Sequence, residues 1–110
     1  MKVCLYQIEV FQSALDWTHG FAHLQNRLYI PGKGVLGYRA GAKIDFFRED
    51  EEVIEEAQSI VEGKEKGKFI GQVDLPPEVV EDVVSLGRRC NFTRAEFKRR
   101  ARALVELIKG

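Results

Sequence analysis

Residues 28–62 read LYIPGKGVLGYRAGAKIDFFREDEEVIEEAQSIVE, and this stretch holds the pattern that decides the fold. It opens with strand-forming residues and a glycine-rich turn at residues 31–34, which is typical of a β-hairpin. Residues 35–47 then alternate apolar with polar side chains, which predicts one long returning strand. Asp50 stands where a helix N-cap is expected, and residues 51–62 carry an apolar stripe backed by glutamates, which predicts an amphipathic helix.

Toward the N-terminus, the sequence predicts a strand followed by a helix. Residues 2–12 alternate in hydrophobicity and are rich in strand-forming residues, so we expect a strand there. Ser13 is suited to cap a helix. The large apolar residues that follow recur at helical spacing: Trp17, Phe21, Leu24 and Leu28. We therefore expect a helix over residues 13–28.

Toward the C-terminus, a strand and two helices are expected. Residues 69–74 predict a short strand, and the two prolines that follow predict the start of a helix with valines on its core face. The last helix has the strongest local signal, because Thr93 can act as its N-cap and Glu96 completes a capping box. Phe92 and Phe97 have the spacing of a hydrophobic staple across the same helix start.

The order of expected elements is β-α-β-β-α-β followed by two helices. Over residues 1–75 this order is that of a ferredoxin-like α+β fold, an antiparallel sheet with two helices on one face. Residues 76–110 would add a C-terminal helical pair. The chain has 110 residues, so we expect a single domain that spans residues 1–110.

Composition excludes several classes of protein. The chain carries 17 basic and 17 acidic residues and is 45% hydrophobic, which is unlike a disordered protein, and it has no apolar run long enough to cross a membrane. The first residues lack the pattern of a secretion signal. The two cysteines, Cys4 and Cys90, have no metal-binding spacing. We expect both to be buried apolar residues of a cytoplasmic protein.

The zero net charge hides two oppositely charged segments. Residues 45–62 hold one basic and eight acidic residues, whereas residues 88–110 hold eight basic and two acidic residues. These segments can pair with each other in the fold, or they can present two separate fields of opposite sign. The sequence leaves both alternatives open.

The basic C-terminal segment is the candidate functional site. Its helical spacing would place three cations in one line, at i, i+4 and i+8: Arg94, Lys98 and Arg102. Arginine side chains in a line are suited to the phosphates of DNA or RNA, because each guanidinium presents a fork of donors. The predicted nucleic-acid-binding residues are Arg88, Arg89, Thr93, Arg94, Lys98, Arg99 and Arg102. The alternative is that these cations pair with the glutamate-rich helix, within the chain or between two chains.

Residues 69–108 resemble a ribbon-helix-helix DNA-binding domain of the MetJ/Arc type. The strand over residues 69–75 runs into two prolines and a helix, and the second helix opens with Thr93-Arg94-Ala95-Glu96, as in that family. The resemblance implies a homodimer whose paired strands enter the major groove of DNA. It also implies two sets of contacts: Ile70, Gln72 and Asp74 with the groove, and Thr93 and Arg94 with a phosphate.

Other chemistry has less support in the sequence. Residues 32–37 match G-x-G-x-x-G, but a strand follows them where a nucleotide site needs a helix, so hairpin glycines are the better interpretation. Asp16, His19 and His23 would share one edge of the expected helix and are candidate metal ligands, with packing residues as the alternative. No nucleophile with an adjacent base is visible, and we expect no cofactor.

These observations favour a non-enzymatic nucleic-acid-binding or regulatory protein that forms a homodimer. One alternative is a protein–protein interaction module, such as an inhibitor or an assembly subunit, that docks through its charged helices. A further alternative is a small metal-dependent enzyme that uses the aspartate and the two histidines.

Overall fold

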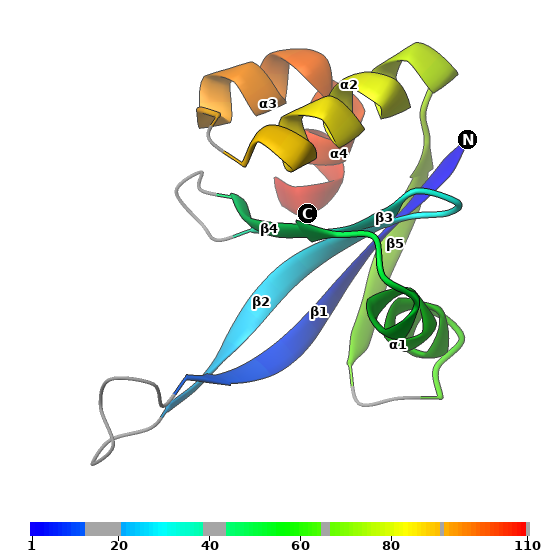
Figure 1. Ribbon diagram of the computed structural model, residues 1–110, viewed down its shortest axis with the longest axis vertical. Helices are drawn as coiled ribbons and strands as arrows, with labels where there is room; N and C mark the ends of the chain where they lie inside the picture. Colours follow the sequence, from blue (N-terminus) through cyan, green and yellow to red (C-terminus); the bar gives the residue numbers. More distant parts are fainter. Residues whose placement is uncertain (13–20, 39–43, 65–66, 91, 110) are drawn as a thin grey trace.

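The protein is built on a five-stranded antiparallel sheet with helices on both faces (Figure 1). The α+β class is therefore confirmed. The computed structural model describes residues 1–12, 21–38, 44–64, 67–90 and 92–109. In chain order the elements are β1 (Lys2–Gln12), β2 (Phe21–Ile30), β3 (Gly34–Tyr38), β4 (Ile44–Arg48), α1 (Glu51–Val61), β5 (Lys68–Asp74), α2 (Pro77–Arg89), α3 (Arg94–Arg100) and α4 (Arg102–Lys109).

The topology of the sheet differs from the expected ferredoxin-like order. The strands lie in the order β4-β3-β2-β1-β5, and each neighbouring pair is antiparallel. The first four strands therefore form a meander, and β5 returns to pair with β1 after α1. A βαββαβ fold needs a helix between its first two strands, and the described residues before β3 contain none.

The helix expected over residues 13–28 is wrong where the structure describes it, because Phe21–Ile30 forms β2. Leu24 and Leu28 suit either structure, since positions four apart share one face of a helix and also one face of a strand. Pairing with β1 along nearly the whole length of β2 decides between the two structures. The expected cap at Ser13 lies outside the described residues.

The single strand expected over residues 35–47 is two strands. β3 and β4 pair antiparallel, with Leu36 opposite Phe47, and residues 39–43 between them lie outside the described residues. Both faces of β3 are buried rather than one. An alternating pattern cannot show whether a second layer covers the other face, so the sequence suggested a half-exposed strand.

The hairpin between β2 and β3 is confirmed. The Lys33 amide donates a hydrogen bond to the Ile30 carbonyl over 2.9 Å, and Gly32 has a φ of +77°. That conformation is open to glycine without steric cost. Gly34 allows a close approach to β4, because a Cβ there would lie 2.5 Å from the carbonyl oxygen of Arg48.

Side chains of β1 alternate between two hydrophobic cores on opposite faces of the sheet. Val3 and Leu5 belong to the core that α2, α3 and α4 cover, and Cys4 and Tyr6 belong to the core that α1 covers. Because strand side chains have a period of two, the first half of β1 is buried on both faces. The sheet therefore separates α1 from the other three helices.

The predicted helix starts are confirmed. The Asp50 carboxylate accepts a hydrogen bond from the Val53 amide at the start of α1. The Thr93 hydroxyl accepts one from the Glu96 amide over 3.1 Å at the start of α3. The rings of Phe92 and Phe97 lie 5.9 Å apart and are both buried, as a hydrophobic staple requires.

The last helix expected from the sequence is broken in two. Ala101 has φ −133° and ψ 50°, so α3 ends before it and α4 begins after it. The break directs α4 against β5, where Leu107 lies directly over Gly71. A Cβ at position 71 would lie 3.0 Å from a methyl group of Leu107, so that side chain would have to shift slightly.

The two cysteines differ in exposure. Cys4 is buried as expected, but Cys90 is exposed, which corrects the expectation that both are core residues. Cys90 ends α2 in the left-handed conformation, with a φ of 53°, and so lies at the rim of the fold. Among the described residues, no helix combines the length and apolar character that a membrane crossing requires.

Candidate functional site

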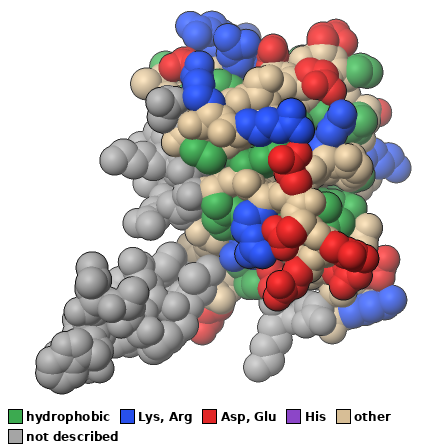
Figure 2. Space-filling model, in the orientation of Figure 1, with side chains coloured by type: hydrophobic (Ala, Val, Ile, Leu, Met, Phe, Trp, Pro, Cys, Tyr) green, Lys and Arg blue, Asp and Glu red, His purple; other side chains and the backbone are tan. Residues whose placement is uncertain are grey.

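The acidic helix α1 and the basic helix α3 lie on opposite faces of the sheet (Figure 1). Figure 2 shows Lys and Arg side chains gathered at the top of the molecule, over α3, and Asp and Glu side chains gathered at the lower right, over α1. Only one ion pair joins the two charged segments among the described residues, between Arg88 and Glu49 at 2.7 Å. The two charged helices therefore present separate fields.

Three arginines of the basic segment are bonded to carboxylates. Their partners lie in the β4–α1 connection, in α3 and in α2: Arg88 with Glu49, Arg89 with Glu96, and Arg100 with Asp82. The hydrogen bond to Glu49 raises the pKa of Arg88 above its usual value. The hydrogen bond from Arg89 lowers the pKa of Glu96, so that carboxylate stays ionised. These pairs neutralise part of the predicted site.

The remaining cations form an exposed basic surface, which we define as Lys98, Arg99 and Arg102. All three are exposed, and within the described part of the chain none makes an ion pair or a side-chain hydrogen bond. Arg99 lies near enough to Glu96 to lower the pKa of that carboxyl, but the shorter contact belongs to Arg89. The basic surface thus has donors that the fold does not use.

The predicted line of three cations is not a line on one helix. Lys98 lies in α3 and Arg102 begins α4, so the bend at Ala101 falls between them. The side chain of Arg94 lies outside the described part of the structure. The spacing i, i+4 and i+8 requires a continuous helix, and the chain does not provide one.

The structure places four of the residues that the ribbon-helix-helix resemblance singles out. Thr93 uses its hydroxyl to cap α3. Ile70 packs against the core under α2–α4. Gln72 and Asp74 are exposed on β5, and Asp74 accepts a hydrogen bond from the N-terminal amino group over 2.7 Å. That bond lowers the pKa of Asp74.

The structure describes the backbone of only one of the three candidate metal ligands. His23 lies on β2, opposite Val10 of β1, so it cannot have helical spacing from His19. Asp16 and His19 lie outside the described residues. Within the described ranges, no group of three or more histidine, cysteine, aspartate or glutamate residues is placed to hold a metal ion.

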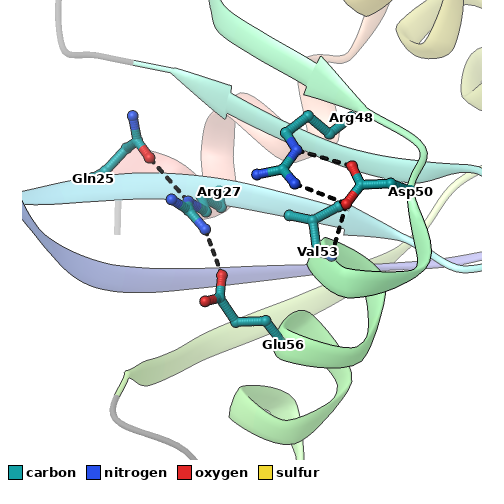
Figure 3. A network of polar contacts seen from close by, with 6 residues as sticks. All are labelled: Gln25, Arg27, Arg48, Asp50, Val53 and Glu56. Carbon is teal, nitrogen blue, oxygen red and sulfur yellow. Dashed lines mark hydrogen bonds and ion pairs between the residues drawn. The ribbon is translucent and has the colours of Figure 1, made fainter.

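A polar network on the α1 side of the sheet was missed by the sequence reasoning (Figure 3). The Arg27 guanidinium donates hydrogen bonds to Glu56 over 2.7 Å and to Gln25 over 2.9 Å, and it lies over the Phe46 ring at 5.1 Å. Arg48 donates two hydrogen bonds to Asp50, which lowers the pKa of that carboxyl. The Gln25–Arg27 and Arg48–Asp50 contacts are local, but Arg27 and Glu56 are 29 positions apart, so no local pattern could have shown the contact that joins the sheet to α1.

Tyr6 lies beneath this network. Its side chain is fully buried, and its hydroxyl has no hydrogen-bond partner of good geometry among the described residues. Burial raises the pKa of Tyr6 to about 12, although the nearby guanidinium of Arg27 opposes the shift. The network therefore joins α1 to the sheet through Arg27 and Glu56.

Comparisons of the chain with protein-family models, with curated proteins and with solved structures found no match.

Proposed function

We propose that the protein is a non-enzymatic nucleic-acid-binding protein whose basic surface contacts the phosphate backbone. The observation that carries this proposal is that Lys98, Arg99 and Arg102 are exposed and lack carboxylate partners in the described part of the chain. Cations that the fold does not neutralise can release counterions from a polyanion.

The position of the acidic helix supports this proposal. If α1 packed against α3, its glutamates would neutralise the basic surface before a phosphate could bind. Because α1 lies across the sheet, this competition is absent within one chain. The net charge of zero therefore does not prevent binding of a polyanion, since the field near α3 is set by the local cations.

The bonded arginines extend the basic surface. Arg89 and Arg100 are each about half exposed while they contact their carboxylates, so they present donors at the edge of the same surface. Phosphate contacts of this kind fix position without reading sequence. We therefore expect binding that depends on salt more than on base sequence.

The free thiols of Cys4 and Cys90 agree with a cytoplasmic location.

The test is fluorescence anisotropy of the full chain with labelled duplex DNA and duplex RNA of one sequence. Three phosphate contacts predict a slope of log K against log salt of about −2.7 on DNA. Between about 50 and 200 mM salt, the affinity should therefore fall about 40-fold. The variant Lys98→Ala/Arg99→Ala/Arg102→Ala should remove most of this salt dependence.

A matched comparison sets the variant Arg99→Ala/Arg102→Ala beside a control variant, Lys2→Ala/Lys68→Ala. Both variants lose two exposed cations without an ion-pair partner in the described structure, but the control residues lie on β1 and β5. We expect the first variant to reduce the salt slope by about 1.8 and the control to leave it nearly unchanged. Equal losses in the two variants, or no measurable binding by the wild-type chain at low salt, would contradict the proposal.

A further inference from the structure

An exposed acidic surface on α1 has the opposite charge to the basic surface. We define it as Glu51, Glu52 and Glu55, which are exposed and make no ion pair with other described residues. Acidic residues beside them already have partners: Asp50 with Arg48, Glu56 with Arg27, and Glu62 with Lys64. Within the described residues, three carboxylates on α1 therefore have no cation partner, and three cations of α3 and α4 have no carboxylate partner.

The sheet keeps these two surfaces apart. α1 covers the face of the sheet that carries Cys4 and Tyr6, and α3 belongs to the layer on the other face. Figure 2 shows the acidic side chains over α1 and the basic side chains over α3 as two separate groups. Oppositely charged surfaces that cannot meet within a chain are complementary between chains.

We infer that the basic surface of one copy binds the acidic surface of a second copy, head to tail. α1 and α3 cover opposite faces of the sheet, so the simplest contact uses one surface of each copy. The contact is therefore heterologous, and it leaves one acidic and one basic surface open at the ends of the assembly. Association through these surfaces continues beyond a dimer instead of closing.

The strength of this contact follows from its exposure. Exposed ion pairs contribute little individually and are screened by salt. The association is therefore weak, and it is present at low ionic strength and high protein concentration. It uses the same basic surface as the proposed function, so the inference rests on that surface being open. Nucleic acid, with its closely spaced phosphates, displaces the acidic surface of the neighbouring copy.

The test is sedimentation equilibrium of the full chain over a range of concentrations, at about 20 mM and about 500 mM salt. We expect the average mass to rise beyond that of a dimer at low salt and to return to that of a monomer at high salt. Two variants each remove one surface: Glu51→Gln/Glu52→Gln/Glu55→Gln, and Lys98→Ala/Arg99→Ala/Arg102→Ala. Each should remain monomeric alone.

An equimolar mixture of the two variants gives the sharpest result. One variant keeps only the basic surface and the other keeps only the acidic surface, so a single contact can form between them. The mixture should therefore reach a dimer and stop there. The control variant is Glu78→Gln/Glu106→Gln, which removes two exposed carboxylates from α2 and α4 and should associate like the wild-type chain. Thermal melting of each variant confirms that it is folded.

The outcomes separate this inference from the proposed function. The glutamine variant of α1 should not associate, but it should bind duplex DNA at least as tightly as the wild-type chain. Loss of association with retained binding supports both ideas, and association without any nucleic-acid binding overturns the proposed function alone. A wild-type chain that stays monomeric at low salt, a closed dimer, or association that survives both sets of substitutions overturns the head-to-tail contact.

Discussion

The Arg27 guanidinium lies 2.7 Å from the Glu56 carboxylate and links the middle of the sheet to the outer side of α1. The arginine side chain is only 14% exposed, whereas that of Glu56 is 43% exposed. Arg27 also donates to Gln25 and covers the ring of Phe46. Arg27 thus contacts a buried amide, an aromatic ring and a helix, so its loss should cost more than the loss of Glu56.

We expect Arg27→Met to lower the free energy of unfolding by about 2 kcal/mol, because it removes a donor from buried Gln25 and a charge from the face of Phe46. Glu56→Gln should cost only about 0.5 kcal/mol, since its carboxylate is half exposed and screened. Urea denaturation of both variants measures the difference. Equal losses would mean that the ion pair alone accounts for the role of Arg27.

Local signals predicted those parts of the fold whose cause is local. The caps of α1 and α3 need only an acceptor side chain and a free amide within three residues, and the structure shows both bonds. The turn at Gly32 needs only a glycine. The path of residues 21–30 depends instead on β1, which lies elsewhere in the chain. Helical spacing of Phe21, Leu24 and Leu28 could not reveal that pairing.

The candidate site was predictable in composition but not in geometry. The sequence indicated which cations are concentrated near the C-terminus, and it left open whether they meet the acidic helix. Whether the cations meet the acidic helix depends on which face of the sheet each helix covers. The structure shows this, because Leu5 packs in the core under α2–α4 and Tyr6 packs in the core under α1. Carboxylates that neutralise Arg88 and Arg100 come from other elements, so no spacing rule could identify them.

Tyr6 should make the fold less stable at alkaline pH. Its pKa is raised to about 12 by burial, above an unfolded value of about 10. The folded state favours the neutral phenol. The contribution of Tyr6 to the free energy of unfolding is therefore complete below about pH 10 and is lost as the pH rises from about 10 to about 12. The full loss is about 2.7 kcal/mol.

Urea denaturation of wild-type and Tyr6→Phe protein at several pH values measures this effect. The Phe variant should lose the part of the pH dependence that belongs to Tyr6. Near pH 7 it should be about as stable as the wild-type chain, because the hydroxyl it removes has no good hydrogen-bond partner among the described residues. Identical pH profiles for the two proteins would show that Tyr6 titrates equally in the folded and unfolded states.

Two glycines of the β2–β3 hairpin should respond differently to alanine. A Cβ at Gly34 would lie 2.5 Å from the Arg48 carbonyl oxygen, a backbone atom of β4 that cannot move without disturbing the β3–β4 pairing. We expect Gly34→Ala to cost about 3 kcal/mol. Gly32→Ala meets no atom within 4 Å and should cost about 1 kcal/mol, for its φ of +77° alone. Chemical denaturation measures the loss of stability in each variant. The reverse order would show that β4 moves to make room for the added methyl group.

The basic surface should also be open to enlargement. Asp82 lies on α2 and bonds to Arg100 at 3.2 Å, so Asp82→Asn frees a cation next to Arg99. We expect tighter binding to duplex DNA and a salt slope steeper by about 0.9, which is one added phosphate contact. Glu78→Gln changes the net charge equally on the same helix, but Glu78 makes no ion pair within the described structure. Anisotropy titrations should therefore show a steeper slope for Asp82→Asn alone, and a similar change in both variants would indicate a response to net charge rather than to Arg100.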